Sequence, residues 1–167
     1  IASHSSVHKL CPHHRNLKDE QILAIKKSNG MIGLNPYPFF IDTEFKKKEE
    51  KFRKNFKKTI DDISLKENDL SVRWIKKQHF LQKKLQEIVP ILDIYIDHIE
   101  YIINLAGIDH VGIGSDYDGL DCLPKGLLDC RDHIKIIQKL DSRGYTSKDI
   151  EKIMGLNILR VFQEVKS

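Results

Sequence analysis

The sequence has few cysteines and no long hydrophobic run. None of its apolar stretches approaches the roughly 20 residues that a membrane-spanning helix needs, so we expect no membrane segment in this chain. The three cysteines, at positions 11, 122 and 130, are odd in number and irregularly spaced, which argues against a disulfide framework and favours reduced thiols. The cellular compartment stays open, with the cytoplasm as the working expectation.

The excess of positive charge is confined to one segment. The chain of 167 residues carries a formal net charge of +4, but residues 44–84 contribute 14 Lys and Arg against 7 Asp and Glu, a balance of +7. In this segment Phe45, Phe52 and Phe56 recur at helical spacing, which indicates an amphipathic helix with a solvated, lysine-rich face. We prefer this interpretation to a surface for nucleic acid or for an anionic membrane, and we expect no nucleic-acid partner.

Three short apolar runs are typical of buried strands, and helical patterns separate them. The strand candidates are residues 1–3, 31–35 and 110–115. The helix candidates are residues 17–29, 44–63, 68–89, 91–105, 131–142, a helix from 146, and 157–165. Asn16 and Asp19 predict a capped start for the first helix, as Thr146 and Asp149 do for a later one. Trp74 and Ile75 are expected in the buried apolar set of the helix at 68–89.

The alternation of strands and helices predicts an α/β fold with parallel strands and crossover helices. Three parallel strands are few for such a sheet, whereas a closed (β/α)8 TIM-type barrel takes roughly 250 residues. We therefore expect the C-terminal part of such a barrel, its last three strand–helix units, with a helical insertion at 44–89. No linker divides the chain, so residues 1–167 are treated as a single domain fragment.

Two candidate site residues follow the first strand. His4 lies at a strand's carboxyl end, where a barrel places functional side chains, and could reach a metal or a substrate. The alternative is a core histidine bonded to a neighbour. Arg15 lies in the loop before a helix, where its guanidinium could clamp a carboxylate, or it is a solvated loop arginine. Four histidines and one cysteine within residues 4–14 lack the paired spacing of a zinc knuckle, which we reject.

The third candidate is Asp116, which follows the last strand. An aspartate there can serve as a metal ligand, or as an acid or base beside a metal-bound water. The glycines at 112, 114 and 119 let backbone approach closely, but they do not form a dinucleotide-binding loop. That loop would need a helix to follow it, and residues 119–126 have the composition of a loop.

Taken together, these segments resemble the membrane (renal) dipeptidase family of zinc metallopeptidases, in its bacterial form. Three motifs carry the resemblance. They are Ser-His-Ser-Ser at 3–6 with His-x-Arg-Asn at 13–16, the run at 111–119, and a closing region with Leu-Pro-x-Gly-Leu at 123–127 and Gly-x-Asn-x-Leu-Arg-Val at 155–161. The likeness extends over the whole chain except about 41–88, which departs in length and composition.

The resemblance implies a barrel enzyme that hydrolyses dipeptides with two zinc ions per complete enzyme. It implies that His4 is a zinc ligand, that Arg15 binds the substrate carboxylate, and that Asp116 is a proton donor or acceptor beside the substrate amine. The residues expected to line the substrate pocket are Asn35, Tyr37 and Gly119. The family accepts a D-residue at the C-terminal position, so both stereochemistries are expected, and the resemblance also allows a homodimer.

The family's other metal ligands have no counterpart in these residues. A His-x-Asp pair, a bridging Glu and a further His are expected upstream, so we expect the 167 residues alone to be inactive and poorly folded. Two rival interpretations stay open. One is a non-catalytic, helix-rich binding module that uses the insertion at 44–89. The other is an amidohydrolase-type barrel hydrolase in which Asp116 mimics a metal-binding aspartate.

Overall fold

Three segments pair in parallel at the centre of the fold. The computed structural model describes residues 1–166, apart from the side chains of Asp118 and Lys166. β1 (Ile32–Leu34) pairs in parallel with β2 (Val111–Ile113). The expected strand at 1–3 is reduced to one parallel bridge between Ala2 and Ile32. β1 is therefore central, with the N-terminal segment on one side and β2 on the other.

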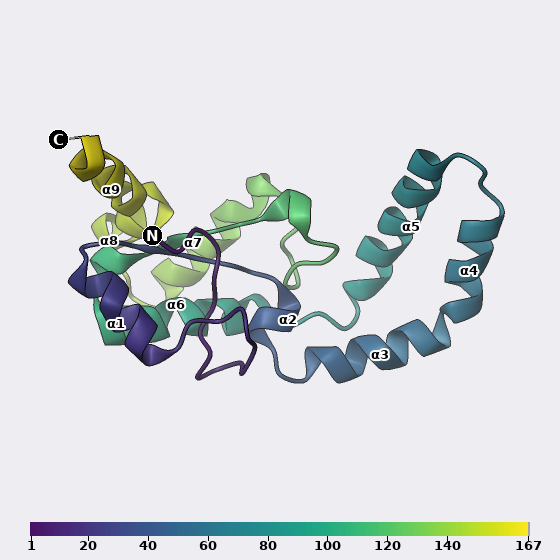
Figure 1. The fold of residues 1–167 in the computed structure, drawn as a ribbon, viewed down its shortest axis with the longest axis horizontal. Helices are drawn as coiled ribbons and strands as arrows, with labels where there is room; N and C mark the ends of the chain where they lie inside the picture. The colour runs from purple at the N-terminus through teal and green to yellow at the C-terminus, as the bar shows by residue number, and fades with distance from the viewer. Residues whose placement is uncertain (167) are drawn as a thin grey trace.

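Helices surround this small sheet (Figure 1). They are α1 (Asp19–Lys27), α6 (Leu92–Ala106), α7 (His133–Ser142), α8 (Ser147–Glu151) and α9 (Asn157–Lys166), with short turns of helix at Ile108–His110, Tyr117–Gly119, Cys130–Asp132 and Lys152–Leu156. Ile32, Leu34 and Val111 are fully buried and join one core with apolar side chains of α1, α6, α7 and α8. The predicted α/β class is confirmed, and so is the capping box of Thr146 at the start of α8.

The N-terminal segment bulges where it passes β1. Ala2 accepts a hydrogen bond from the Gly33 backbone N–H, and a regular parallel ladder would then have His4 donate to the Gly33 carbonyl. Ser5 makes that donation instead, at 2.9 Å, so the segment holds one extra residue. A Cβ atom on Gly33 would lie 2.3 Å from the Ser3 carbonyl oxygen, and one on Gly114 would lie 2.5 Å from it. Both positions must be glycine for the bulge to fit.

The first helix begins two residues later than the sequence predicts. Its N-cap is Lys18, not Asn16. Asn16 is buried, and its side-chain amide donates to the carbonyl oxygens of Cys11 at 2.8 Å and Phe40 at 2.7 Å. The predicted cap is wrong because these two bonds, one of them to a residue 24 positions away, anchor the side chain in the interior. Its Oδ1, the atom that would accept a capping bond, has no partner.

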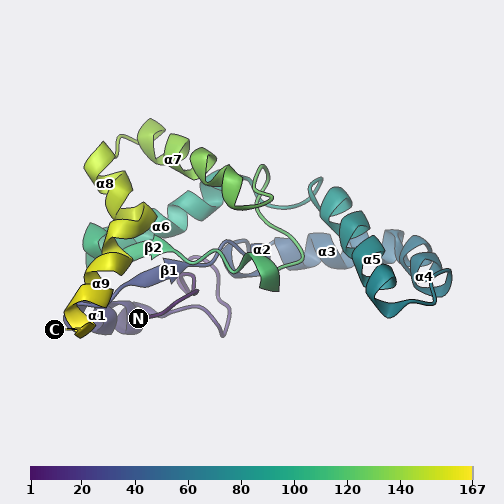
Figure 2. The same cartoon turned by 90° about the horizontal axis from the view of Figure 1, so that it is seen from above.

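A helical arm extends away from the sheet in both views (Figures 1 and 2). It follows α2 (Pro38–Ile41) and comprises α3 (Phe45–Asn55), α4 (Lys57–Leu65) and α5 (Leu70–Leu85). The single helix predicted at 44–63 breaks at Phe56, and the arm has its own small core, which includes Phe45, Phe52, Leu81 and Leu85. The expectation that Trp74 and Ile75 are buried is wrong, since they are 61% and 58% exposed.

Two expected properties of the chain agree with the structure. Cys11, Cys122 and Cys130 are all free thiols, as their number and spacing predict. No helix within residues 1–166 is long and apolar enough to cross a membrane.

A neutral histidine joins the N-terminal segment, α2 and α6. His98 is 1% exposed; its Nδ1 accepts from the Val7 backbone N–H at 3.1 Å, and its Nε2 is 3.2 Å from the Ile41 carbonyl oxygen. Because Nδ1 accepts, the proton must lie on Nε2 and donate to Ile41. Burial lowers the pKa of His98 to about 4, from 6.5.

We predict that this histidine makes stability depend on pH. The unfolded chain takes up a proton near pH 6.5 and the folded chain near pH 4, so stability is full above pH 6.5 and is lost as the pH falls toward 4. The free energy of unfolding of the full-length protein in urea should drop by about 2 kcal/mol between pH 7 and pH 5 through this group. His98→Gln should remove that part of the drop, and His14→Gln, at an exposed histidine, should keep it. An identical pH dependence in all three proteins would contradict the assignment.

Candidate functional site

The carboxyl ends of the three parallel segments meet at one edge of the sheet. His4, Asn35 and Asp116 lie at or just after these ends, one on each segment. The bulge brings the Ser3 carbonyl close to both Gly33 and Gly114, so the three segments lie close together at this edge. His4 and Asp116 thus lie at the carboxyl ends of parallel segments, where the sequence places them.

His4 and Arg15 are in direct contact on one side of this edge. The guanidinium Nη2 of Arg15 is 3.2 Å from His4 Nε2 and donates to it, since arginine has no acceptor. The Nδ1 of His4 is 2.8 Å from the Ser3 hydroxyl, so both ring nitrogens have partners. The guanidinium carbon of Arg15 also lies 5.8 Å from the centre of the Phe40 ring, within range of a cation–π contact. These contacts fix a half-exposed histidine and an exposed cation beside each other.

Asn35 holds the centre of the edge and orients Asp116. It is fully buried, and its backbone carbonyl accepts from the Ser6 hydroxyl at 2.8 Å. Its side-chain oxygen accepts from the Tyr37 backbone N–H at 2.8 Å, which leaves its amide nitrogen to donate to Asp116 Oδ2 at 3.2 Å. Asn35 therefore links the second and third segments at the site.

Asp116 adopts the left-handed backbone conformation, with φ of 49° and ψ of 31°. Aspartate is one of the few residues that tolerate this conformation, and here it begins a tight turn in which Gly119 N–H donates to the Asp116 carbonyl at 3.0 Å. The carboxylate folds over the turn: a Cβ atom on Gly119 would lie 2.7 Å from Asp116 Oδ1. The glycine thus leaves room for the carboxylate.

Tyr37 connects the site to the helical arm through Asp121. Its hydroxyl donates to Asp121 Oδ1 at 3.2 Å, and Arg53 of α3 approaches the other Asp121 oxygen at 3.7 Å. Burial, reinforced by the Asp121 charge, raises the pKa of Tyr37 far above its usual value. Tyr37 therefore stays protonated and acts as a hydrogen-bond donor at physiological pH.

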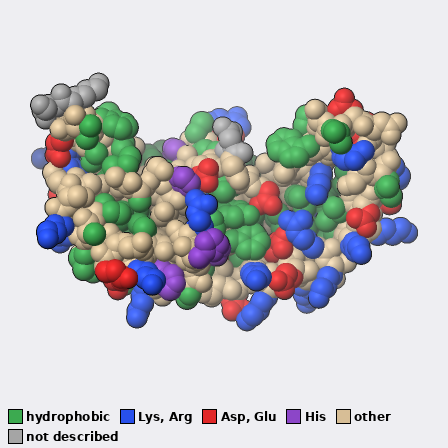
Figure 3. Space-filling view, in the orientation of Figure 1, with side chains coloured by type: hydrophobic (Ala, Val, Ile, Leu, Met, Phe, Trp, Pro, Cys, Tyr) green, Lys and Arg blue, Asp and Glu red, His purple; other side chains and the backbone are tan. Residues whose placement is uncertain are grey.

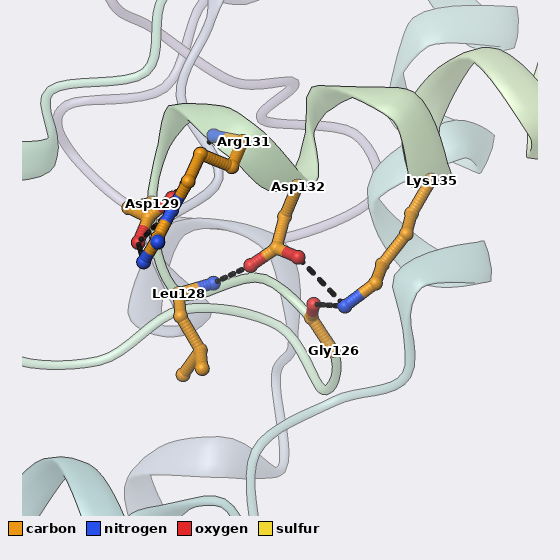
Figure 4. A network of polar contacts seen from close by, with 6 residues as sticks. All are labelled: Gly126, Leu128, Asp129, Arg131, Asp132 and Lys135. Atoms are coloured by element: carbon orange, nitrogen blue, oxygen red, sulfur yellow. Dashed lines mark hydrogen bonds and ion pairs between the residues drawn. The ribbon is translucent and has the colours of Figure 1, made fainter.

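The loop after the site is held in shape by a polar network (Figure 4). Asp132 accepts from the Leu128 backbone N–H at 2.7 Å and pairs with Lys135 at 2.7 Å. Lys135 also donates to the carbonyl of Gly126, which has a φ of +95°. Exposed ion pairs contribute little stability, but these bonds define one conformation for the loop that returns from Asp116 to α7. The positive φ of Gly126 explains in physical terms why a glycine stands at this position of the closing region.

His4 is the candidate zinc ligand that the sequence places at this edge. Among the side chains that the structure describes, no group of three or more His, Cys, Asp and Glu could hold a metal ion. His4 is a single imidazole whose nitrogens already have partners. The residues present thus do not by themselves fit a zinc centre. Sequence reasoning also missed Phe40 and Asp121, which no local motif singles out because their contacts come from distant segments.

The whole chain matches a known protein family. It fits the family profile for membrane dipeptidase (peptidase family M19) over residues 1–167. It is 33% identical over 169 residues to an uncharacterized dipeptidase of Schizosaccharomyces pombe, covering 99% of this chain and 30% of that protein. It is 30% identical over 164 residues to the dipeptidase aclJ of Aspergillus oryzae, covering 98% and 29%. The chain spans about 30% of the length of these two relatives.

Solved structures share its fold. The probable dipeptidase PvdM of Pseudomonas aeruginosa is 27% identical with a TM-score of 0.68, over 97% of this chain and 44% of that one. A metallo peptidase of Rhodobacter sphaeroides, liganded with a phosphinate mimic of the dipeptide L-Ala-D-Ala, is 24% identical with a TM-score of 0.62, over 92% and 32%. The second likeness bears on the fold alone.

We predict that Gly119→Ala displaces the Asp116 carboxylate. The added methyl group would lie 2.7 Å from Oδ1, so the carboxylate must turn and lose its bond to the Asn35 amide. A crystal structure of the variant full-length protein should show an Asp116–Asn35 separation beyond 3.5 Å. Gly155→Ala is the matched control, because its new methyl group would meet nothing within 4 Å. An unmoved Asp116 in Gly119→Ala would show that the turn has more room than the geometry indicates.

Proposed function

Because the chain belongs to the membrane dipeptidase family, we propose that it forms part of a zinc-dependent enzyme that hydrolyses dipeptides. One observation carries the proposal. The edge of the sheet presents a guanidinium beside the N-terminal segment, where Arg15 contacts His4, and a carboxylate after β2, where Asp116 contacts Asn35. A dipeptide is a zwitterion with one charge of each sign at its two ends. The signs of the two charges at the edge match those of the substrate's ends.

The two charged residues take different ends of the substrate. Arg15 receives the C-terminal carboxylate, because its fork geometry allows two parallel hydrogen bonds to both oxygens. Asp116 receives the amine and exchanges a proton with it or with the attacking water. Asn35 is a positioning residue, since its amide holds Asp116 Oδ2 at 3.2 Å. Tyr37 and Gly119 line the pocket beside Asp116.

The zinc centre is proposed to be completed by ligands beyond these residues. His4 would contribute one imidazole, which requires Arg15 to release its Nε2 or Ser3 to release its Nδ1. Zinc in hydrolases activates water and polarises the scissile carbonyl. In the same proposal the three strand–helix units are the C-terminal part of a (β/α)8 barrel, whose catalytic residues lie at the carboxyl ends of its strands.

The test is hydrolysis by the full-length protein with added zinc. We predict that L-Ala-D-Ala and L-Ala-Gly are cleaved, and that N-acetylated or C-amidated forms of the same dipeptides are not. Blocking either end removes a charge that Asp116 or Arg15 would bind. Amino-acid release followed by chromatography gives the rates. Equal cleavage of blocked and free dipeptides would overturn the proposed recognition, and no cleavage of any dipeptide would overturn the activity.

Arg15→Lys should raise KM and lower kcat for free dipeptides. Lysine keeps the charge but not the two parallel bonds, so kcat/KM should fall roughly 10- to 100-fold. The matched control is Arg131→Lys, because Arg131 is exposed and pairs only locally with Asp129. Steady-state kinetics on L-Ala-D-Ala give both constants. If Arg15→Lys leaves them unchanged, Arg15 does not bind substrate.

A further inference from the structure

A cavity of about 620 Å³ lies between the helical arm and the loop that follows β2. The arm contributes Trp74, Ile75 and Gln78 of α5, and the opposite wall contains Tyr37, Tyr117 and Asp121. The space-filling view shows the hollow between the arm and the rest of the molecule, with hydrophobic side chains at its border (Figure 3). Its volume is in the range of small-molecule sites, roughly 300–1,000 Å³.

The wall from α5 is apolar without being packed. Trp74 and Ile75 lie at positions of helical periodicity that predict burial, yet they are 61% and 58% exposed. The same helix buries Leu81 and Leu85 in the core of the arm. The helix therefore has two apolar surfaces, of which one faces the cavity, and an exposed tryptophan beside an isoleucine is typical of a binding surface.

The cavity adjoins the proposed position of the substrate amine. Gly119 lines it and lies so near Asp116 that a Cβ atom would be 2.7 Å from the carboxylate. Tyr37 lines it too, and its backbone N–H is bound by Asn35, which donates to Asp116. Arg15 lies at the other side of the edge, with His4 and Phe40. A dipeptide with its carboxylate at Arg15 and its amine at Asp116 would direct its first side chain toward the cavity.

Among the described residues that line the cavity, Asp121 has its charge compensated. Asp121 accepts from the Tyr37 hydroxyl and approaches Arg53 of α3. Burial and nearby acidic groups raise the pKa of Tyr117 to about 12, so it is neutral as well. The other described lining side chains are aromatic, aliphatic and amide, together with the imidazole of His79. Trp74, Ile75 and Leu120 give this surface its apolar part, which favours a neutral apolar side chain over a charged one.

We propose that this cavity is the subsite for the side chain of the substrate's N-terminal residue, and that Trp74 selects dipeptides in which this residue is large and apolar or aromatic. The inference rests on the proposed dipeptidase function and adds the substrate class. It also gives the helical arm a role in specificity. Trp74 of the arm lies 37 positions after Tyr37 in the sequence, and both residues line the same cavity.

The test compares Phe-Gly with Gly-Gly as substrates of the full-length protein. Trp74→Ala should lower the ratio of the two kcat/KM values about 10-fold, because an aromatic contact is lost only for Phe-Gly. Trp74→Phe should restore most of the ratio. Leu70→Ala is the matched control: Leu70 is on the same helix and 74% exposed, but it does not line the cavity, so the ratio should stay at the wild-type value.

The possible results separate the two proposals. If the wild-type protein cleaves both dipeptides and Trp74→Ala leaves the ratio unchanged, the subsite is wrong while the dipeptidase function stands. A wild-type preference for Gly-Gly would also overturn the subsite. If the wild-type protein cleaves no dipeptide at all, the proposed function fails, and the subsite fails with it.

Discussion

The close passage of the Ser3 carbonyl over Gly33 and Gly114 is the constraint on which the site depends. Any side chain at either glycine would come within 2.5 Å of that oxygen. The space lets the N-terminal segment bulge by one residue while it still pairs with β1. The bulge shifts the register of the segment between Ala2 and Ser5, the stretch that contains His4, whose ring contacts Arg15. In the Gly-x-Gly pattern at 112–114, Gly114 thus leaves room for backbone and Gly112 for the Met31 side chain, and no bound phosphate is needed to explain the pattern.

From this edge a continuous series of contacts leads into the helical arm. Asp116 is bound by Asn35, Asn35 by the backbone of Tyr37, and the Tyr37 hydroxyl by Asp121, which approaches Arg53. The members of the series come from both sides of the insertion and from the insertion itself. The arm is therefore joined to the candidate site by directional bonds as well as by the apolar contacts of Tyr37 and Phe39 with its core.

The sequence predicts the parts of the site that follow strands and misses those that depend on tertiary contacts. His4 and Asp116 could be placed because an apolar run ends just before each of them. Asn16 was misassigned because local capping rules cannot foresee a carbonyl 24 residues away. Trp74 was misassigned because helical periodicity identifies an apolar face but cannot tell whether a core or a cavity lies against it. Asp121 carries no motif, and only the fold brings Tyr37 to it.

The separate core of the arm has an evolutionary consequence. Phe45, Phe52, Leu81 and Leu85 pack with one another and belong to a different cluster from the one that supports β1 and β2. Changes in α3–α5 that keep the contact of Arg53 with Asp121 and the packing on Tyr37 and Phe39 can therefore accumulate without disturbing the strands beside His4 and Asp116. The sequence also predicts that residues 41–88 depart from the family in length and composition, within a family profile that matches residues 1–167 as a whole. Selection can thus vary exposed side chains in the wall of the cavity, such as Trp74 and Ile75, at little cost to the packing beneath the candidate site.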